Sequence, residues 1–201
     1  MEVSKIHLSS AEMELMQDAE IILTKNRILE KMKALLEEVQ GKQIEFVKKK
    51  PLSAEVFKVS PKISKGENYL GLPYLILDYP RYSSENNFLF IRTMFWWGNF
   101  FSCTLHLAGG AKLEFADRIK SSHSQLQNCY ISASEDQWVH QLEEPNYHKI
   151  HSMNKAQFDQ CCDNFNHIKI ASSHPLAEWE KAPFKLFENW KRYLSVCGLI
   201  P

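Results

Sequence analysis

The sequence has no excess of charge of either sign, because 24 lysine and arginine residues balance 24 aspartate and glutamate residues. Proteins that bind duplex DNA usually carry a basic excess over the whole domain. The one basic cluster is a lysine run at 48–50 that Pro51 ends, and a solvated loop explains it better than phosphate contacts do. We therefore expect no nucleic-acid partner.

Catalytic and cofactor motifs are also missing. The chain contains no Gly-x-x-x-x-Gly-Lys-Ser/Thr, no Gly-x-Gly-x-x-Gly and no Gly-x-Ser-x-Gly pattern. These absences remove the usual sequence evidence for phosphate loops, dinucleotide sites and serine hydrolases. We expect no cofactor, and we favour a non-catalytic protein over an enzyme.

Histidines and cysteines gather late in the chain, but not at the spacing of metal ligands. His148 and His151 form the tightest histidine pair, and on a strand they would point to opposite faces. There is no Cys-x-x-Cys and no His-Glu-x-x-His pattern. A metal site needs several such side chains converging at about 2.0–2.3 Å. We therefore expect ordinary core or surface residues and no metal site.

The sequence has an amino terminus that does not run from basic to apolar residues, so we expect no secretory leader. Its five cysteines are an odd number, and two of them, Cys161 and Cys162, are adjacent. Both features favour a reducing cytoplasm in which the thiols are mostly free and buried.

One stretch of the sequence is nearly long enough and apolar enough to suggest a membrane-spanning helix, but its residue order argues against one. Between Arg92 and Lys112 lie 19 residues without a formal charge, close to the ~20 that a spanning helix needs. Gly98 and Asn99 interrupt this stretch, and polar residues then recur at every second position, at Ser102, Thr104 and His106. That order is typical of a bent, half-polar element rather than a helix facing lipid, so we expect no membrane partner.

The first element present is a helix over about 9–41. Ser9 and Glu12 have the spacing of a capping box. Apolar residues then repeat every seven positions in two adjacent rows, and Gly41 is the expected end of the helix. A break near 24–26 is possible on the sequence. The two rows are Leu15, Ile22, Leu29 and Leu36, and Ile21, Ile28 and Leu35.

Two interpretations of these rows compete. Three heptads of apolar repeat suggest a dimerising coiled coil. The stripe is broad, however, and Asp18 and Lys25 occupy the complementary positions in its first half. A broad stripe is typical of a helix that packs on its own domain, and we favour that interpretation.

Residues 69–115 form the predicted β region, which follows a polar connection over 42–68. Runs at 88–97 and 100–108 flank Gly98 and Asn99, which predicts a hairpin with a two-residue turn. In that register Trp97 opposes Phe100, and Thr93 opposes Thr104. Both faces of the hairpin are mostly apolar, so we expect both to be covered.

The rest of the chain is a mixed region over about 120–201. Strands are expected at 147–151 and 167–171, around a helix near 154–164. A last helix enters at Pro183 and stops at Gly198. Residues 111–119 fit a third strand or a helix equally well. The whole predicts a single α+β domain over 1–201, in which a central antiparallel sheet built on the hairpin is covered by the long amino-terminal helix and carboxy-terminal helices.

Arg92 is the first candidate site residue, because it lies on an otherwise apolar strand face. A buried guanidinium needs a carboxylate or an anionic ligand. Asp78 ends the neighbouring strand and is its expected partner, with Glu114 as an alternative. We favour a structural salt bridge over an anion site.

His106 is the second candidate. The two-residue turn places it on the face opposite Arg92, with Thr93, Thr104 and Trp97. A few polar groups on an aromatic wall are typical of small-molecule pockets, and also of a core that pairs its own polar groups. We favour the core. Cys103 would point away from His106 on a strand, which excludes a thiol–imidazole dyad.

The stretch LGLPYLILDYPRY at 70–82, with FLFIRTMFWWGNFFSCTLHL at 88–107, resembles a family of functionally uncharacterised bacterial proteins. The segment ILTKN at 22–26 is similar to that family as well. The resemblance covers about a third of the chain and implies no reaction, cofactor or catalytic residue.

Two functional hypotheses follow from the sequence. The first is a cytoplasmic binding or protein-interaction domain without catalytic activity, either a monomer or a homodimer. The second is a small-molecule enzyme or ligand-binding protein with a pocket on the face of the 88–108 hairpin. Its expected lining is Asp78, Arg92, Thr93, Trp97, Thr104 and His106.

Overall fold

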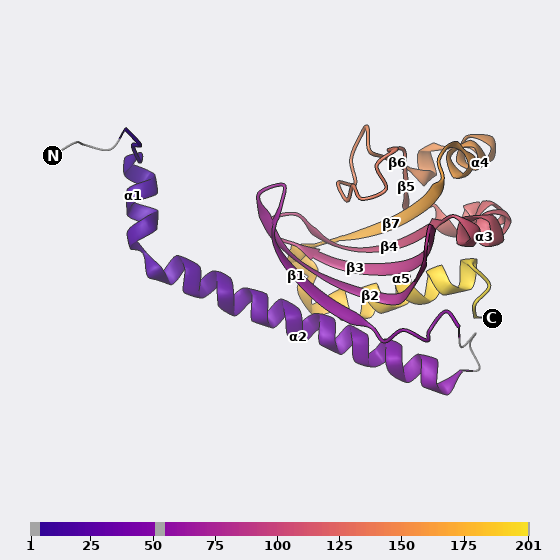
Figure 1. The fold of residues 1–201 in the computed structure, drawn as a ribbon, viewed down its shortest axis with the longest axis horizontal. Coiled ribbons are helices and arrows are strands. Elements are labelled where there is room, and N and C mark those ends of the chain that lie inside the picture. Colours follow the sequence, from indigo (N-terminus) through magenta and orange to yellow (C-terminus); the bar gives the residue numbers. More distant parts are fainter. Residues whose placement is uncertain (1–4, 51–54, 201) are drawn as a thin grey trace.

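The structure is a computed structural model that describes residues 5–50 and 55–200. It is an α+β fold, as the sequence predicts, built on one antiparallel sheet (Figure 1). The strands are β1 (Lys62–Tyr69), β2 (Leu72–Ser84), β3 (Asn87–Trp96), β4 (Phe100–Ala108), β5 (Tyr130–Ser132), β6 (Tyr147–Lys149) and β7 (His167–Pro175). The helices are α1 (Ser10–Gln17), α2 (Ala19–Lys49), α3 (Gly110–Ser121), α4 (Lys155–Asn164) and α5 (Ala182–Val196).

The strand order in the sheet is β1-β2-β3-β4-β7-β5-β6. Helices α2, α3 and α5 cover one face of the sheet. We call it the helical face. The segment that joins β5 to β6, residues 133–146, lies over the other face (Figure 1). We call this stretch the covering segment, and the face beneath it the polar face.

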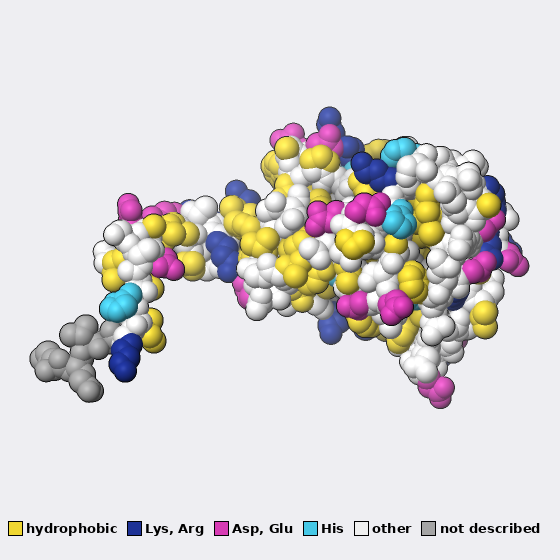
Figure 2. Space-filling model, turned by 90° about the horizontal axis from the view of Figure 1, so that it is seen from above, with side chains coloured by type: hydrophobic (Ala, Val, Ile, Leu, Met, Phe, Trp, Pro, Cys, Tyr) yellow, Lys and Arg dark blue, Asp and Glu magenta, His cyan; other side chains and the backbone are white. Residues whose placement is uncertain are grey.

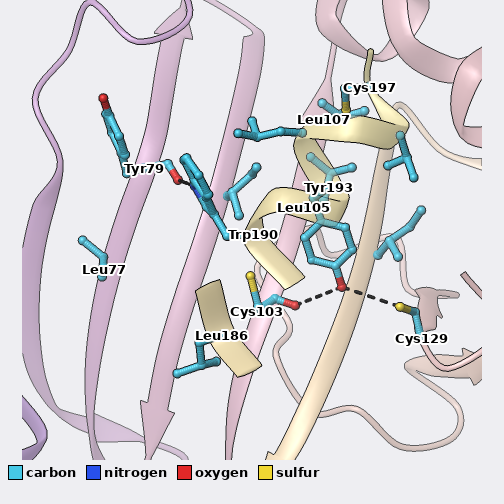
Figure 3. Close-up of a cluster of buried hydrophobic side chains, with 14 of the residues drawn as sticks. Leu77, Tyr79, Cys103, Leu105, Leu107, Cys129, Leu186, Trp190, Tyr193 and Cys197 are labelled. Atoms are coloured by element: carbon cyan, nitrogen blue, oxygen red, sulfur yellow. Dashed lines mark hydrogen bonds between the residues drawn. The ribbon is translucent and has the colours of Figure 1, made fainter. Parts of the chain in front are cut away.

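The core lies between the sheet and α5. Tyr193 donates from its hydroxyl to the carbonyl of Cys103 on β4 (3.3 Å), and Trp190 donates from Nε1 to the carbonyl of Tyr79 on β2 (2.5 Å) (Figure 3). The Trp190 and Tyr79 rings stack with an interplanar angle of 8°. These contacts bury aromatic surface while pairing its polar atoms, which fixes α5 across the middle of the sheet.

The amino-terminal helix differs from the prediction at both ends. It breaks at Asp18 rather than near 24–26, because the Asp18 side chain caps α2 by accepting from the Glu20 amide. It continues past Gly41 to Lys49, since Phe46 packs edge-on against Trp190 with ring centroids 5.8 Å apart. The lysine run therefore ends a helix instead of forming a loop, and Pro51 lies outside the described residues.

The two halves of α2 have different surroundings. Its second half packs on the helical face through Leu29, Met32, Leu35, Leu36 and Val39, all buried. Within 10–28 no side chain is buried. The prediction that the helix packs on its own domain is therefore confirmed for the second half only, and α1 with the start of α2 projects from the body (Figure 1).

The hairpin forms, but its predicted register is wrong by one residue. The pairs are Trp96 with Phe100 and Arg92 with Thr104, so that three residues rather than two make the turn. A shift of one residue moves a strand's side chains to the other face. Gly98 supplies the positive φ (71°) of this turn.

Two other boundaries correct the prediction, and one segment that was left open is decided. The sheet begins earlier, because the polar strand β1 pairs with β2. Residues 111–119 belong to α3, with Ala111, Phe115 and Ile119 buried on one side. The strand at 167–171 extends to Pro175.

Candidate functional site

The polar face brings together most of the predicted site residues. Across adjacent strands Asp78 pairs with Arg92, and Arg92 with Thr104. His106 pairs with Lys169 on β7. Thr104 and His106 therefore share a face with Arg92, contrary to the prediction that they lie opposite it. Thr93 is the residue on the other side, fully buried on the helical face beside Cys103.

Arg92 and Asp78 form the predicted salt bridge. The guanidinium donates twice, from Nε to Oδ1 (2.8 Å) and from Nη2 to Oδ2 (2.9 Å). Both side chains are about four-fifths buried. The third nitrogen, Nη1, lies 3.3 Å from Nε2 of His140 in the covering segment. Arg92 thus ties the covering segment to the sheet, and the carboxylate neutralises its charge.

His106 also contacts the covering segment. Its Nε2 lies 3.0 Å from Oε1 of Gln137, which implies that Nε2 carries the proton and donates to the amide oxygen. The Trp138 ring stands edge-on to the imidazole with ring centroids 5.5 Å apart. These contacts favour the structural role predicted for His106.

Lys169 is the residue that the sequence analysis missed. It is only 1% exposed, and its ammonium group donates to the carbonyl of Val139 in the covering segment (2.5 Å). The group also lies 5.6 Å from the centre of the Tyr147 ring. The alternation of His167, Ile168, Lys169 and Ile170 on a strand was the available signal, because it places the lysine on the same face as His167.

Burial sets the protonation of this cluster. It lowers the pKa of His106 to about 3 and that of Lys169 to about 7, and the neighbouring charges of Lys169 and Arg92 add to the respective shifts. Burial, followed by Lys169 and Arg92, also lowers the pKa of His140 well below its usual value. At neutral pH the imidazoles are therefore uncharged hydrogen-bonding groups rather than cations.

A groove of about 770 Å³ opens beside this cluster at the start of α3. Its wall includes Phe88 of β3, Gln137 of the covering segment and His167 of β7. Gln137 is the residue that bonds to His106, so the groove and the buried cluster share a wall. This groove lies at one end of the hairpin face, but it is not the predicted pocket, because none of the six predicted residues is part of its lining. They are Asp78, Arg92, Thr93, Trp97, Thr104 and His106.

Trp97 lies elsewhere. It sits in the hairpin turn and lines a different groove, of about 540 Å³, together with Ile21 and Ile28 of α2 and Leu72 and Pro73 of β2. The structure therefore does not bring Trp97 together with His106.

The projecting helices carry a second candidate surface. Large apolar side chains on them, and at Leu8 just before α1, are between 36% and 64% exposed, and Figure 2 shows apolar groups on this extension of the molecule. They are Leu8, Met13, Leu15, Met16, Ile21, Ile22, Leu23 and Ile28. Exposed apolar surface of this extent is a usual sign of an interaction site.

Neither a metal centre nor a spanning helix is found in the described ranges 5–50 and 55–200. No three histidine, cysteine, aspartate or glutamate side chains there are grouped to hold a metal ion. No helix there is long and apolar enough to cross a membrane.

Comparison with known proteins gives no assignment. No family model, no curated protein and no solved structure matches the chain.

Proposed function

We propose that this protein is an interaction domain that self-associates through residues 10–28, which we call the arm. The observation that carries the proposal is the solvent exposure of apolar rows on a helix that projects from the body. In water, packing such rows against a second apolar surface lowers the free energy. The partner that fits best is the arm of a second copy, in antiparallel orientation.

The order of residues on the arm supports an antiparallel pair. If the two-fold axis passes between Ile21 and Ile22, then Ile21 of each copy faces Ile22 of the other. Asp18 of each copy then faces Lys25 of the other, at the same distance from the axis. Within its own chain Lys25 is paired with Glu67 of β1 (2.7 Å), so Asp18 of the partner copy would join an existing ion pair. A parallel pair would place Asp18 beside Asp18 and Lys25 beside Lys25, which is unfavourable for like charges. An antiparallel pair is also the closed, two-fold symmetric arrangement that most dimers adopt.

The groove at the base of the arm supports the same arrangement. It lies between α2 and the hairpin turn, and its apolar lining includes Ile28, Leu72 and Trp97. In an antiparallel pair the outer end of one arm reaches the base of the other. The groove then receives α1 of the partner copy, whose Met13, Leu15 and Met16 are exposed.

We further propose a reducing, cytoplasmic location and no catalytic activity of its own. All five cysteines are free, and four of them are buried. Thiols that stay unpaired in this way are typical of reducing compartments.

The test is the mass of the protein in solution. Ile22→Glu places a charge at the proposed two-fold axis and is expected to weaken self-association at least about a hundredfold, because the carboxylate would be desolvated. The matched control is Leu113→Glu, which changes an 82% exposed leucine on α3, away from the arm. Sedimentation equilibrium should show a dimer for the natural chain and for Leu113→Glu, and a monomer for Ile22→Glu. A monomeric natural chain at high micromolar concentration contradicts the proposal.

A further inference from the structure

The groove of about 770 Å³ beside α3 combines three features that point to a ligand. It lies at the amino-terminal end of a twelve-residue helix, and it is lined by a lysine. Part of its wall is a buried histidine whose Nε2 has no hydrogen-bond partner among the described residues. None of the three takes part in the proposed self-association through the arm.

The first turn of α3 has free backbone donors. Gly109, at the position before the helix, offers no side chain to cap it. Asn87 accepts from the Gly110 amide through its Oδ1 (2.5 Å). The Lys112 amide follows in the same turn, where no residue four positions back in the helix can accept from it. Lys112 lines this groove, whereas Ala111 lines a separate one. Such an end of a helix favours negative charge.

Lys112 adds a full positive charge to this end of the groove. Its ammonium group donates to the carbonyls of Phe165 and Asp163. Within the described part of the chain it is paired with no carboxylate at ion-pair distance, whereas Lys120 on the same helix is paired with Asp163 (2.7 Å). Lys112 therefore keeps its charge available to a ligand in the groove.

His167 supplies the observation that is hardest to explain without a ligand. It is 95% buried, lines the groove, and its Nε2 has no hydrogen-bond partner among the described residues. Its ring stacks on Phe165 with an interplanar angle of 14°, so the imidazole is held in one orientation. An unpaired polar group in a buried position costs about 1–3 kcal/mol, and a bound hydrogen-bonding group would remove that cost.

We propose that this groove binds a small organic oxyanion, with its phosphate or carboxylate group held by the first turn of α3, Lys112 and His167. The aromatic rings of Phe88 and Phe165 form part of the wall and fit a flat, ring-bearing ligand body. Glu135 also lines the groove, and its negative charge opposes the anion. The site therefore favours ligands whose anionic group lies at the helix end, away from Glu135.

The test follows amide and imidazole NMR signals while sodium phosphate or sodium benzoate is added, with sodium chloride at equal ionic strength as the reference. Saturable shifts at Lys112 and His167 with phosphate or benzoate, and none with chloride, support the site. Shifts with phosphate alone identify a phosphate ligand, and tighter binding of benzoate identifies a ring-bearing carboxylate. Shifts that are absent, or equal with chloride, overturn it.

Variants sharpen the result. Lys112→Gln is expected to weaken binding by about tenfold, the loss of one charge-assisted contact. The matched control Lys120→Gln removes an equal charge from the same helix outside the groove and should leave binding within about twofold. Glu135→Gln should tighten binding. Equal effects of Lys112→Gln and Lys120→Gln would show nonspecific screening and overturn the proposal.

A second readout is the titration of His167. Burial, with the nearby lysine charges, lowers its pKa to about 4 in the free protein. An anion bound against the ring favours the protonated imidazole, so phosphate should raise this pKa. An unchanged titration in saturating phosphate and benzoate overturns the contact with His167.

Discussion

Basic groups lie side by side on the polar face. Their hydrogen bonds and one carboxylate offset the cost of burying like charges close together. Arg92 is paired with the carboxylate of Asp78, while Lys169 donates to a carbonyl oxygen and lies over a tyrosine ring. His106 and His140 lie between them as neutral rings. Because Arg92, His106 and Lys169 each contact the covering segment, the cluster attaches that segment to the sheet.

Removing the carboxylate should therefore be costly. Asp78→Asn leaves Arg92 without its charge partner beside Lys169. We expect a loss of about 2 kcal/mol in the free energy of unfolding. This loss is below the range for fully buried pairs because both side chains retain some exposure. The control Glu37→Gln breaks the exposed pair with Lys33 and should cost less than about 0.5 kcal/mol. Urea denaturation measures both, and equal losses would contradict this role for Asp78.

The neutral histidines predict how stability depends on acid. Burial lowers the pKa of His106 to about 3 and that of His167 to about 4 in the folded protein. In the unfolded chain the same histidines have the usual pKa of 6.5, so they become protonated as the pH falls below 6.5. The unfolded state then binds more protons, so the free energy of unfolding falls as pH drops from 6.5 toward 3. Denaturation at pH 7.5, 6 and 5 tests this, and His106→Gln should flatten the slope. Constant stability from pH 6.5 to 4 would contradict it.

Lys169 acts in a higher pH window. Its pKa is lowered to about 7 in the folded protein, from 10.5 in the unfolded chain. The contribution of Lys169 to the free energy of unfolding is thus lowest below pH 7, and this contribution rises as pH increases from 7 to 10.5. Lys169→Met should remove most of that rise in denaturation experiments between pH 7 and 9.5. An unaltered rise in the variant would assign it to another group.

At the scale of elements, the hairpin shows where sequence reasoning succeeds and where it stops. The reversal at Gly98 could be predicted, because alternating apolar runs flank a Gly-Asn pair. The turn length could not, since two-residue and three-residue turns are both compatible with this pair. The difference decides whether His106 faces Thr93 or Arg92, and only the observed register places it with Arg92.

Two glycines give a matched test of these elements. Gly98 has a φ of 71° in the turn, so Gly98→Ala is expected to cost about 1 kcal/mol in the free energy of unfolding. Gly41 lies inside α2, and a Cβ there would meet nothing within 4 Å. Gly41→Ala should therefore raise the free energy of unfolding by about 0.5–1 kcal/mol. Thermal or urea unfolding of both variants checks the pair, and the same sign of change would contradict the assigned turn and helix.

Helix α2 illustrates a different limit. The apolar rows are continuous in the sequence from Leu15 of α1 to Leu36 of α2. The body covers them only from Leu29 onward. The period of the rows predicts a helix but cannot show where the sheet ends beneath it. That boundary depends on the position of the hairpin turn, which long-range packing determines.

At the scale of the whole molecule, the fold class and the Asp78–Arg92 pair could be predicted, because patterning and charge pairing are local or nearly so. The covering segment could not. Its residues have no regular period, and its contacts with Lys169 and Arg92 join positions 30 and 48 residues apart in the chain. The groove beside α3 escaped prediction for the same reason, since four separate segments form its lining.

The molecule thus divides into a body and an arm, and the central claim is that two arms pair in antiparallel orientation. The most direct measurement is disulfide trapping in a mixture of Asp18→Cys and Lys25→Cys chains, with Cys161 replaced by Ser in both. A disulfide needs Cα atoms about 4.4–6.8 Å apart. In the proposed register the two Asp18 positions are separated by about 10 Å along the helix axis, as are the two Lys25 positions.

Antiparallel pairing of the arms predicts rapid formation of the mixed dimer and little cross-linking of either variant alone. Cross-linking of each variant with itself, or a mixture that stays monomeric under oxidising conditions, would contradict it.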